Sequence, residues 1–297
     1  MAVSAGIRQR AEQLAALLPP LLVEAERIAV TVAQGVHGRR RVGTGDAFWQ
    51  FRRYQPGDPA QSIDWRQSAK RQSYFIRQNE WEAAESVWLW RDDSPSMAWR
   101  SNFGPCEKLE RATLLLLATA ALLVRGGERI ALLGENRLPS SGRSALERMA
   151  QTLLLRPAGV ADGSLPPKAE LPRYARLVLI SDFLSPLDEV AASVRRFAGE
   201  GVSGVLLQVL DPAEQDLPFA GRTRFEGLEG EAPITVSRVE SLADDWRRRL
   251  QVRHERLVDL ARRSGWHFAV HRTDRPAQVA LLALYTALSG QRVLPPR

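Results

Sequence analysis

The residues with the clearest chemical potential are two groups of oxygen-bearing side chains that follow apolar runs of the sequence. Asp92, Ser94 and Ser96 lie at the end of the run 86–92, and Asp182 follows the run 176–181. Carboxylate and hydroxyl oxygens are hard ligands that suit Mg²⁺ or Mn²⁺. Because hydroxyls are neutral, an ion held by two of them keeps positive charge and attracts a carboxylate of another molecule. These four residues therefore predict a metal-dependent docking site.

The same acids have competing interpretations. In a strand-to-helix turn, Asp and Ser often only cap the next helix through its backbone N–H groups. An aspartate nucleophile of the haloacid dehalogenase type would need an acid where Ser94 stands, and a receiver-type pocket would need a later lysine, yet none follows Lys168. The motifs GxxxxGK[ST] and GxSxG are absent as well. We therefore predict a protein that is not an enzyme, and a metal-dependent hydrolase stays as the third hypothesis.

The elements that must position these residues alternate along the chain. Apolar runs typical of buried strands lie at 86–92, 129–133, 176–181, 202–210 and 266–271, and helical patterns lie at 107–125, 144–155, 186–197, 242–263 and 276–288. This alternation predicts an α/β fold with a doubly wound, mainly parallel sheet. In such folds ligands bind beyond the carboxyl ends of the strands, where the strand order reverses. We expect Asp92 and Asp182 to lie together at that edge.

The pattern also predicts how the chain divides. Residues 1–35 are expected to form an N-terminal helical segment. Turn signals between short β-prone segments predict a small, basic, β-rich subdomain over residues 36–83. Residues 84–297 are expected to form the α/β domain, with a hairpin inserted near 211–238 that interrupts the alternation.

Bulk properties favour a folded protein of a reducing compartment. The formal net charge is +7, and the single cysteine, Cys106, excludes an intramolecular disulfide. The first thirty residues lack the layout of a signal peptide. The longest uncharged stretches, 112–124 and 276–291, fall short of the ~20 apolar residues that a membrane span needs. We therefore expect a cytoplasmic protein without a transmembrane segment.

A basic, tryptophan-rich region supports the second functional hypothesis. Arginines are frequent between residues 39 and 77, and most of the tryptophans lie in or near this part of the chain: Trp49, Trp65, Trp81, Trp88, Trp90 and Trp99. Such residues can stack on the bases of a single strand. Packing between two subdomains is the commoner role of clustered tryptophans, and we find no recognised nucleic-acid module. Nucleic-acid binding therefore ranks below docking to a protein.

A longer ordered set of motifs carries a family resemblance. The elements Arg52-x-Tyr54-x-Pro56-Gly57-Asp58 and Ile63-Asp64-Trp65 precede Phe75-Ile76-Arg77 and the Asp92–Met97 motif. Together they resemble the bacterial domain of unknown function 58 family over roughly residues 36–210. The signature residues are expected to serve interaction or structure: Arg52, Tyr54, Gly57, Asp58, Asp64 and Trp65.

The resemblance implies a von Willebrand A-like domain with a metal-ion-dependent adhesion site. Its ligands to Mg²⁺ (or Mn²⁺) would be Asp92, Ser94, Ser96 and Asp182. The threonine of such sites has no clear counterpart here, and Ser141 and Ser144 are the hydroxyl candidates for its place. The resemblance also implies partnership with a MoxR-type AAA+ ATPase or other von Willebrand A proteins in assembling or maturing protein complexes. Many relatives carry N-terminal membrane spans, so a membrane role of this chain would require a partner.

Overall fold

The computed structural model describes residues 23–33, 48–53, 68, 74–79, 86–156, 164–228 and 232–289. The chain divides into two compact units. The smaller unit, His37–Glu85, contains an antiparallel pair formed by β1 (Phe48–Arg53) and β2 (Phe75–Asn79), in which Arg52 pairs with Ile76. The other signature residues lie outside the described residues: Tyr54, Gly57, Asp58, Asp64 and Trp65.

A five-stranded parallel sheet organises the larger unit, which comprises Met1–Val36 and Ser86–Arg297. Its strands, in spatial order, are β4 (Arg129–Leu132), β3 (Ser86–Arg91), β5 (Arg176–Ser181), β6 (Ser203–Leu210) and β9 (His267–Arg272). Every pair of neighbours in this sheet is parallel. The predicted α/β fold with a doubly wound, mainly parallel sheet is thereby confirmed. Four of the five strands are buried almost throughout, which explains their continuous apolar runs.

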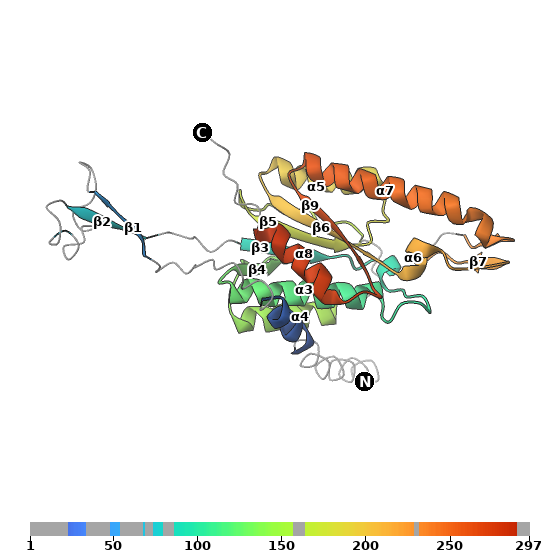
Figure 1. The fold of residues 1–297 in the computed structure, drawn as a ribbon, viewed down its shortest axis with the longest axis horizontal. Coiled ribbons are helices and arrows are strands. Elements are labelled where there is room, and N and C mark those ends of the chain that lie inside the picture. Colours follow the sequence, from blue (N-terminus) through green and yellow to red (C-terminus); the bar gives the residue numbers. More distant parts are fainter. Residues whose placement is uncertain are drawn as a thin grey trace, which may run out of the picture. The chain divides into compact units, whose positions relative to one another are not determined.

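Helices cover both faces of this sheet (Figure 1). The helices on one face are α3 (Lys108–Arg125), α4 (Arg143–Leu155) and α8 (Ala277–Ser289), and those on the other are α5 (Leu187–Gly199) and α7 (Ala243–Arg263). The sheet therefore separates two hydrophobic clusters, one under each helical layer. Residues 23–33 are helical and contribute Ala25, Ile28 and Val32 to the first cluster.

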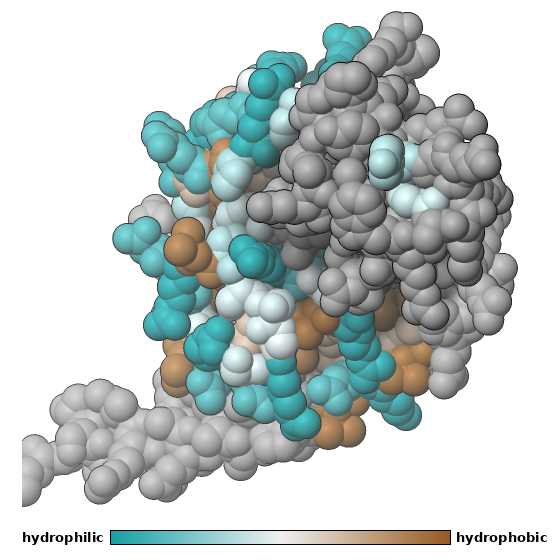
Figure 2. All heavy atoms as spheres, turned by 90° about the vertical axis from the view of Figure 1, so that its left-hand side faces the viewer, coloured by the Kyte–Doolittle hydropathy of each residue, from teal (hydrophilic) through white to brown (hydrophobic). Residues whose placement is uncertain are grey.

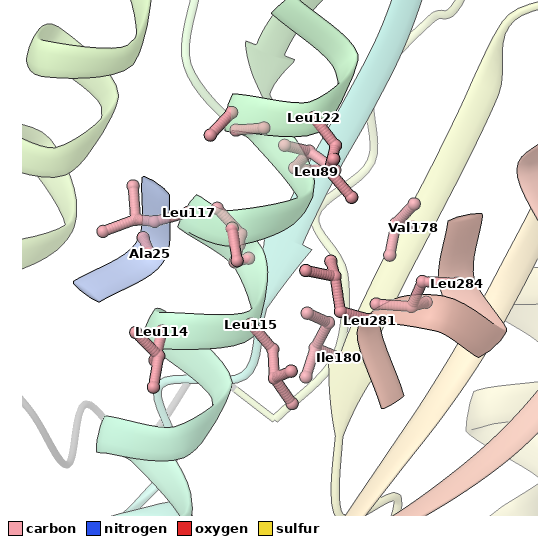
Figure 3. Close-up of a cluster of buried hydrophobic side chains, with 14 of the residues drawn as sticks. Ala25, Leu89, Leu114, Leu115, Leu117, Leu122, Val178, Ile180, Leu281 and Leu284 are labelled. Atoms are coloured by element: carbon pink, nitrogen blue, oxygen red, sulfur yellow. The ribbon is translucent and has the colours of Figure 1, made fainter. Parts of the chain in front are cut away.

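Helix α3 is the centre of the first cluster. It is buried along most of its length, and Leu115, Leu116 and Leu117 are fully buried. Figure 3 shows leucines of α3 between residues of the sheet strands and of α8, with Ala25 on a further side. A helix that is apolar nearly all round has to be enclosed on several sides. This enclosure fixes α3, and with it the first residue of the helix, Lys108, against the sheet.

The segment between β6 and β9 adds a small structure of its own. Helix α6 (Pro212–Asp216) follows β6 directly, with Asp211 as its N-cap in a capping box with Glu214. The strands β7 (Thr223–Phe225) and β8 (Ile234–Val236) then form an antiparallel hairpin, and the 3₁₀ helix η4 (Val239–Leu242) leads into α7. These elements extend beyond the carboxyl end of β6.

The surface is mixed in character. On the face shown in Figure 2, hydrophilic residues lie beside smaller groups of hydrophobic residues. Among the described residues, no helix is long and apolar enough to cross a membrane.

Candidate metal-dependent docking site

The candidate site lies where the strand order reverses. The chain passes from β3 to β4 on one side and then returns to β5 on the other, so the carboxyl ends of β3 and β5 meet at the switch point of the sheet. The backbone N–H of Asp92 donates to the carbonyl of Ile180 at 2.9 Å, which joins the two strand ends. The expected proximity of Asp92 and Asp182 thus follows from the topology.

Asp92 is buried and accepts hydrogen bonds from neutral donors. Its Oδ1 accepts from the Ser94 backbone N–H at 2.8 Å, and its Oδ2 accepts from Ser181 Oγ at 2.6 Å. Burial, followed by the nearby charge of Asp182, raises the pKa of Asp92 from 3.8 to about 6, although these hydrogen bonds oppose the rise. The hydrogen-bond donors to this carboxylate are therefore neutral, and the neighbouring cation Arg91 is hydrogen-bonded to Asp93.

The two serine hydroxyls connect Asp92 to Asp182. Ser94 and Ser96 flank Pro95 at the start of the 3₁₀ helix η2 (Pro95–Met97), and their Oγ atoms lie 3.0 Å apart. Ser96 Oγ donates to Asp182 Oδ2 at 2.8 Å. Ser94 occupies the N-cap position of η2, yet its side chain makes no capping hydrogen bond. Its hydroxyl is therefore directed to the cluster rather than used as a cap.

A buried ammonium group lies at the same carboxylate. The side chain of Lys108 is fully buried, and its Nζ donates to Asp182 Oδ2 at 2.8 Å and to Glu214 Oε1. Burial alone would lower the pKa of Lys108, but Asp182 and Glu214 outweigh that effect and raise it. Glu214 is fixed in turn, because its Oε2 accepts from the Asp211 backbone N–H at 2.8 Å. The lysine stays charged and neutralises part of the acidic cluster.

Several hydrogen bonds fix the loop after β5 around Asp182. Asp182 Oδ1 accepts from the Leu184 N–H at 3.0 Å, and Gln208 Nε2 donates to the Asp182 carbonyl at 2.9 Å. Arg253 of α7 donates from Nε to the Phe183 carbonyl at 2.8 Å. Phe183 has a φ of 51°, a left-handed conformation that a bulky residue seldom adopts. These contacts hold a strained turn that presents the Asp182 carboxylate to Ser96.

The donor set fits a small divalent cation. Ligands about 2.1 Å from Mg²⁺ in an octahedron lie roughly 2.9 Å from their neighbours, and the Ser94–Ser96 and Ser96–Asp182 oxygen pairs have separations of 3.0 Å and 2.8 Å. Asp92 supplies a carboxylate whose hydrogen-bond donors are neutral. Asp182 already pairs with Lys108, which favours an outer position for it. In the described part of the chain, no group of three His, Cys, Asp or Glu side chains is arranged to hold a metal ion, so the hydroxyls are essential to such a site.

The structure does not bring the other predicted hydroxyls to this cluster. Ser141 and Ser144 lie at the start of α4, beside Ser140, which pairs with Ile130 near the amino end of β4. Ile130 is aligned with Val87, five residues before Asp92, so these serines belong to the opposite half of the sheet. The nearby acid Asp93 is also committed elsewhere, because Arg91 Nε donates to its Oδ1 at 3.0 Å.

Sequence reasoning missed three residues of the site: Lys108, Ser181 and Glu214. Lys108 is the first residue of a long, mainly apolar helix and looks like an ordinary polar residue of a first turn. A signal for Glu214 was present, since Asp211-x-x-Glu214 directly after a strand is a capping-box pattern. Nothing in the spacing of these residues indicates that Lys108 and Glu214 meet, because about a hundred residues separate them.

Two mycobacterial proteins are similar to this chain along most of its length. It is 29% identical over 278 residues to "Uncharacterized protein Rv1480" of Mycobacterium tuberculosis (strain ATCC 25618 / H37Rv), which covers 89% of this chain and 86% of that protein. The same values hold for "Uncharacterized protein Mb1516" of Mycobacterium bovis.

Solved structures and a family model complete the comparison. A conserved hypothetical protein BatB from Bacteroides thetaiotaomicron matches with a TM-score of 0.41 and 13% identity, and an aerotolerance-related membrane protein from Bacteroides fragilis matches with 0.40 and 14%. Each match covers 70% of this chain and 100% of the other. The model of the family described as "Protein of unknown function DUF58" matches residues 50–256, and the chain therefore belongs to the DUF58 family.

Proposed function

We propose that this protein is a non-enzymatic adaptor of the cytoplasm that docks an acidic group of a protein partner through a divalent cation. Asp92, Ser94 and Ser96 would hold the cation, and Asp182 would act from an outer position. When bound, Mg²⁺ would supply a positive charge that a partner's carboxylate can complete. The observation that carries the proposal is the line of oxygens from Ser94 Oγ through Ser96 Oγ to Asp182 Oδ2, at spacings that suit a hard cation. The Asp92 carboxylate lies beside this line and accepts from the Ser94 N–H.

The chemistry of the cluster favours binding over catalysis. Lys108 and the Leu184 N–H already engage the oxygens of Asp182, and both oxygens of Asp92 accept hydrogen bonds. Among the described residues of the cluster, no histidine or cysteine offers a nucleophile or a base. His271, at the end of β9, has its pKa lowered to about 4 by burial and by Arg111, and it is buried beneath the surface.

The partner that we propose is a MoxR-type AAA+ ATPase or another von Willebrand A protein, and the role is to help assemble or mature protein complexes. This part of the proposal rests on membership of the DUF58 family together with the docking chemistry of the site. A partner would contribute an exposed Asp or Glu side chain, because a cation held largely by hydroxyls retains charge.

The test compares two pairs of serine hydroxyls. Calorimetric titration of the full chain with MgCl₂ should give a binding isotherm, and Ser94→Ala and Ser96→Ala should each weaken it by at least about tenfold, since each removes a ligand. Ser141→Ala and Ser144→Ala serve as matched controls and should leave the isotherm unchanged. Equal isotherms for all four variants would overturn the proposed site.

The nucleic-acid hypothesis loses part of its support. Trp88 and Trp90 are only 7% and 4% exposed and lie in the second hydrophobic cluster. Their rings pack under α5 and α7 and are not available to stack on bases.

A further inference from the structure

An apolar cavity lies at the same edge of the larger unit as the Asp92 cluster. It has a volume of about 570 Å³, within the range of ligand pockets. Its walls come from η4, from the first turns of α7, and from the insertion between β6 and η4. The apolar residues that line it include Trp99, Leu217, Phe219, Phe225, Ile234 and Trp246.

The walls of this cavity are preorganised. Phe219 packs edge-to-face against Phe225, with ring centroids 5.8 Å apart, and against Phe103 at 6.3 Å. Trp246 Nε1 donates to the Glu214 carbonyl at 2.6 Å, which ties the start of α7 to α6. Trp246 and Ile234 are nevertheless 38% and 65% exposed. Trp246, whose indole N–H is already satisfied, and the exposed Ile234 are therefore suited to receive an apolar group.

The charges that border the cavity are neutralised within the protein. Glu214 pairs with the buried Lys108, and Asp245 pairs with Arg249 at 2.7 Å. An occupant of this cavity therefore meets apolar walls and no uncompensated charge from these residues. The Asp92 carboxylate differs from these acids, because its hydrogen-bond donors are neutral.

One buried side chain separates the cavity from the docking site. Lys108 Nζ lies 2.8 Å from Asp182 Oδ2, pairs with Glu214 of the cavity wall, and lies 6.0 Å from the ring centroid of Trp99 in the same wall. Ser96 of the docking site and Trp99 of the cavity wall lie three residues apart on one segment, and both are partly exposed. The two sites are therefore neighbours on the surface at the carboxyl edge of the sheet. A short peptide segment could reach both.

We infer that this cavity is the second half of the docking site, and that it receives a bulky apolar side chain from the same protein segment whose carboxylate reaches the Asp92 cluster. The inference rests on the docking function proposed above. The acidic group would provide dependence on Mg²⁺, and the apolar group would distinguish one acidic partner from another. Burial of one aliphatic or aromatic side chain contributes at least about tenfold to affinity.

The experiment uses the full chain and a phage-displayed library of random peptides, selected in MgCl₂. We expect the enriched sequences to combine an acidic residue with a bulky apolar residue a few positions away. The affinity of the best peptide is then measured by fluorescence anisotropy. Ile234→Asp should weaken it by at least about tenfold, because it places a charge in the cavity wall.

Val279→Asp is the matched control. Val279 lies on α8, outside the cavity lining, and is 66% exposed, nearly the same as Ile234. Equal effects of the two variants, or a library that enriches no apolar residue, would overturn the inference. A loss of self-association that occurs only in Ile234→Asp would also overturn the inference, because the occupant of the cavity would then be a second copy of the chain.

The two proposals fail in different ways. Peptide binding that depends on Mg²⁺ and on Ser96 but ignores Ile234→Asp would leave the docking function standing without the cavity. Binding that requires Ile234 but is unchanged in chelator would overturn the proposed function, and with it the joint engagement inferred here.

Discussion

Asp92 and Asp182 end neighbouring strands of one sheet, yet their buried carboxylates have different partners. Asp182 accepts from a hydroxyl, a backbone amide and the ammonium of Lys108. The donors to Asp92 are neutral, namely the Ser94 N–H and the Ser181 hydroxyl. A cation of the protein thus donates a hydrogen bond to one acid but not to the other, whose charged neighbour Arg91 pairs with Asp93, although the two acids lie at the same switch point.

This difference indicates which part of the site remains to be completed. We call the buried ion pairs of Lys108 with Asp182 and Glu214 a closed arrangement, because their charges compensate each other. We call the buried Asp92 carboxylate, with its raised pKa and two adjacent hydroxyls, an open arrangement, because no cation donates a hydrogen bond to it. The binding free energy of an added cation should therefore be most favourable at Asp92, Ser94 and Ser96, and least favourable at Asp182.

The largest expected effect comes from removing the internal cation. Lys108→Met would leave Asp182 and Glu214 buried without their counter-charge and should lower the free energy of unfolding by about 3–5 kcal/mol. Urea denaturation of the two proteins measures the difference. Arg143→Met, which breaks the exposed pair with Glu147, is the control and should change stability by less than about 0.5 kcal/mol. Similar losses in both variants would contradict a closed ion-pair arrangement.

The second effect concerns the acid that lacks a cation. Because the pKa of Asp92 is about 6 in the folded chain against 3.8 as the reference value, its contribution to stability is greatest below pH 3.8 and is lost as the pH rises through about 6. In chelator at pH 8, Asp92→Asn should therefore raise the free energy of unfolding by about 1–3 kcal/mol.

The pH series supplies the control for this variant. The gain from Asp92→Asn should shrink as the pH falls from 8 to 4, since the wild-type carboxyl then becomes neutral in the folded chain. In saturating Mg²⁺ at pH 8 the order should reverse, because a cation would stabilise the wild type alone. A gain that is independent of pH would show that Asp92 does not carry the buried charge described here.

The sequence predicted the fold better than it predicted the surroundings of the acids. Apolar runs such as 176–181 could be read as buried strands, because a strand that is covered on both faces is apolar at consecutive positions, and this pattern is visible in the sequence. The switch point then followed, and with it the meeting of Asp92 and Asp182. Lys108 and Glu214 could not be paired, since their contact depends on how α3 and α6 are placed. Ser141 and Ser144 were candidates for the place of the missing threonine because they lie near the start of the next helix. The sequence does not show that the adjacent Ser140 pairs with Ile130, near the amino end of β4.

The smallest effect tests the hydrogen bond that partly compensates Asp92. Ser181 Oγ donates to Asp92 Oδ2 and also accepts from the Phe183 N–H at 2.8 Å. Ser181→Ala should lower the free energy of unfolding by about 1–2 kcal/mol at pH 8 in chelator, and it should raise the pKa of Asp92 further above 6. Measuring the same substitution in an Asp92→Asn background separates the contributions of the two hydrogen bonds of Ser181. If the loss of stability is as large there as in the wild type, it comes from the hydrogen bond to Phe183 in the strained turn. If the loss is smaller there, the hydroxyl stabilises the charged Asp92, and this strand end carries a charged carboxylate that can bind a cation.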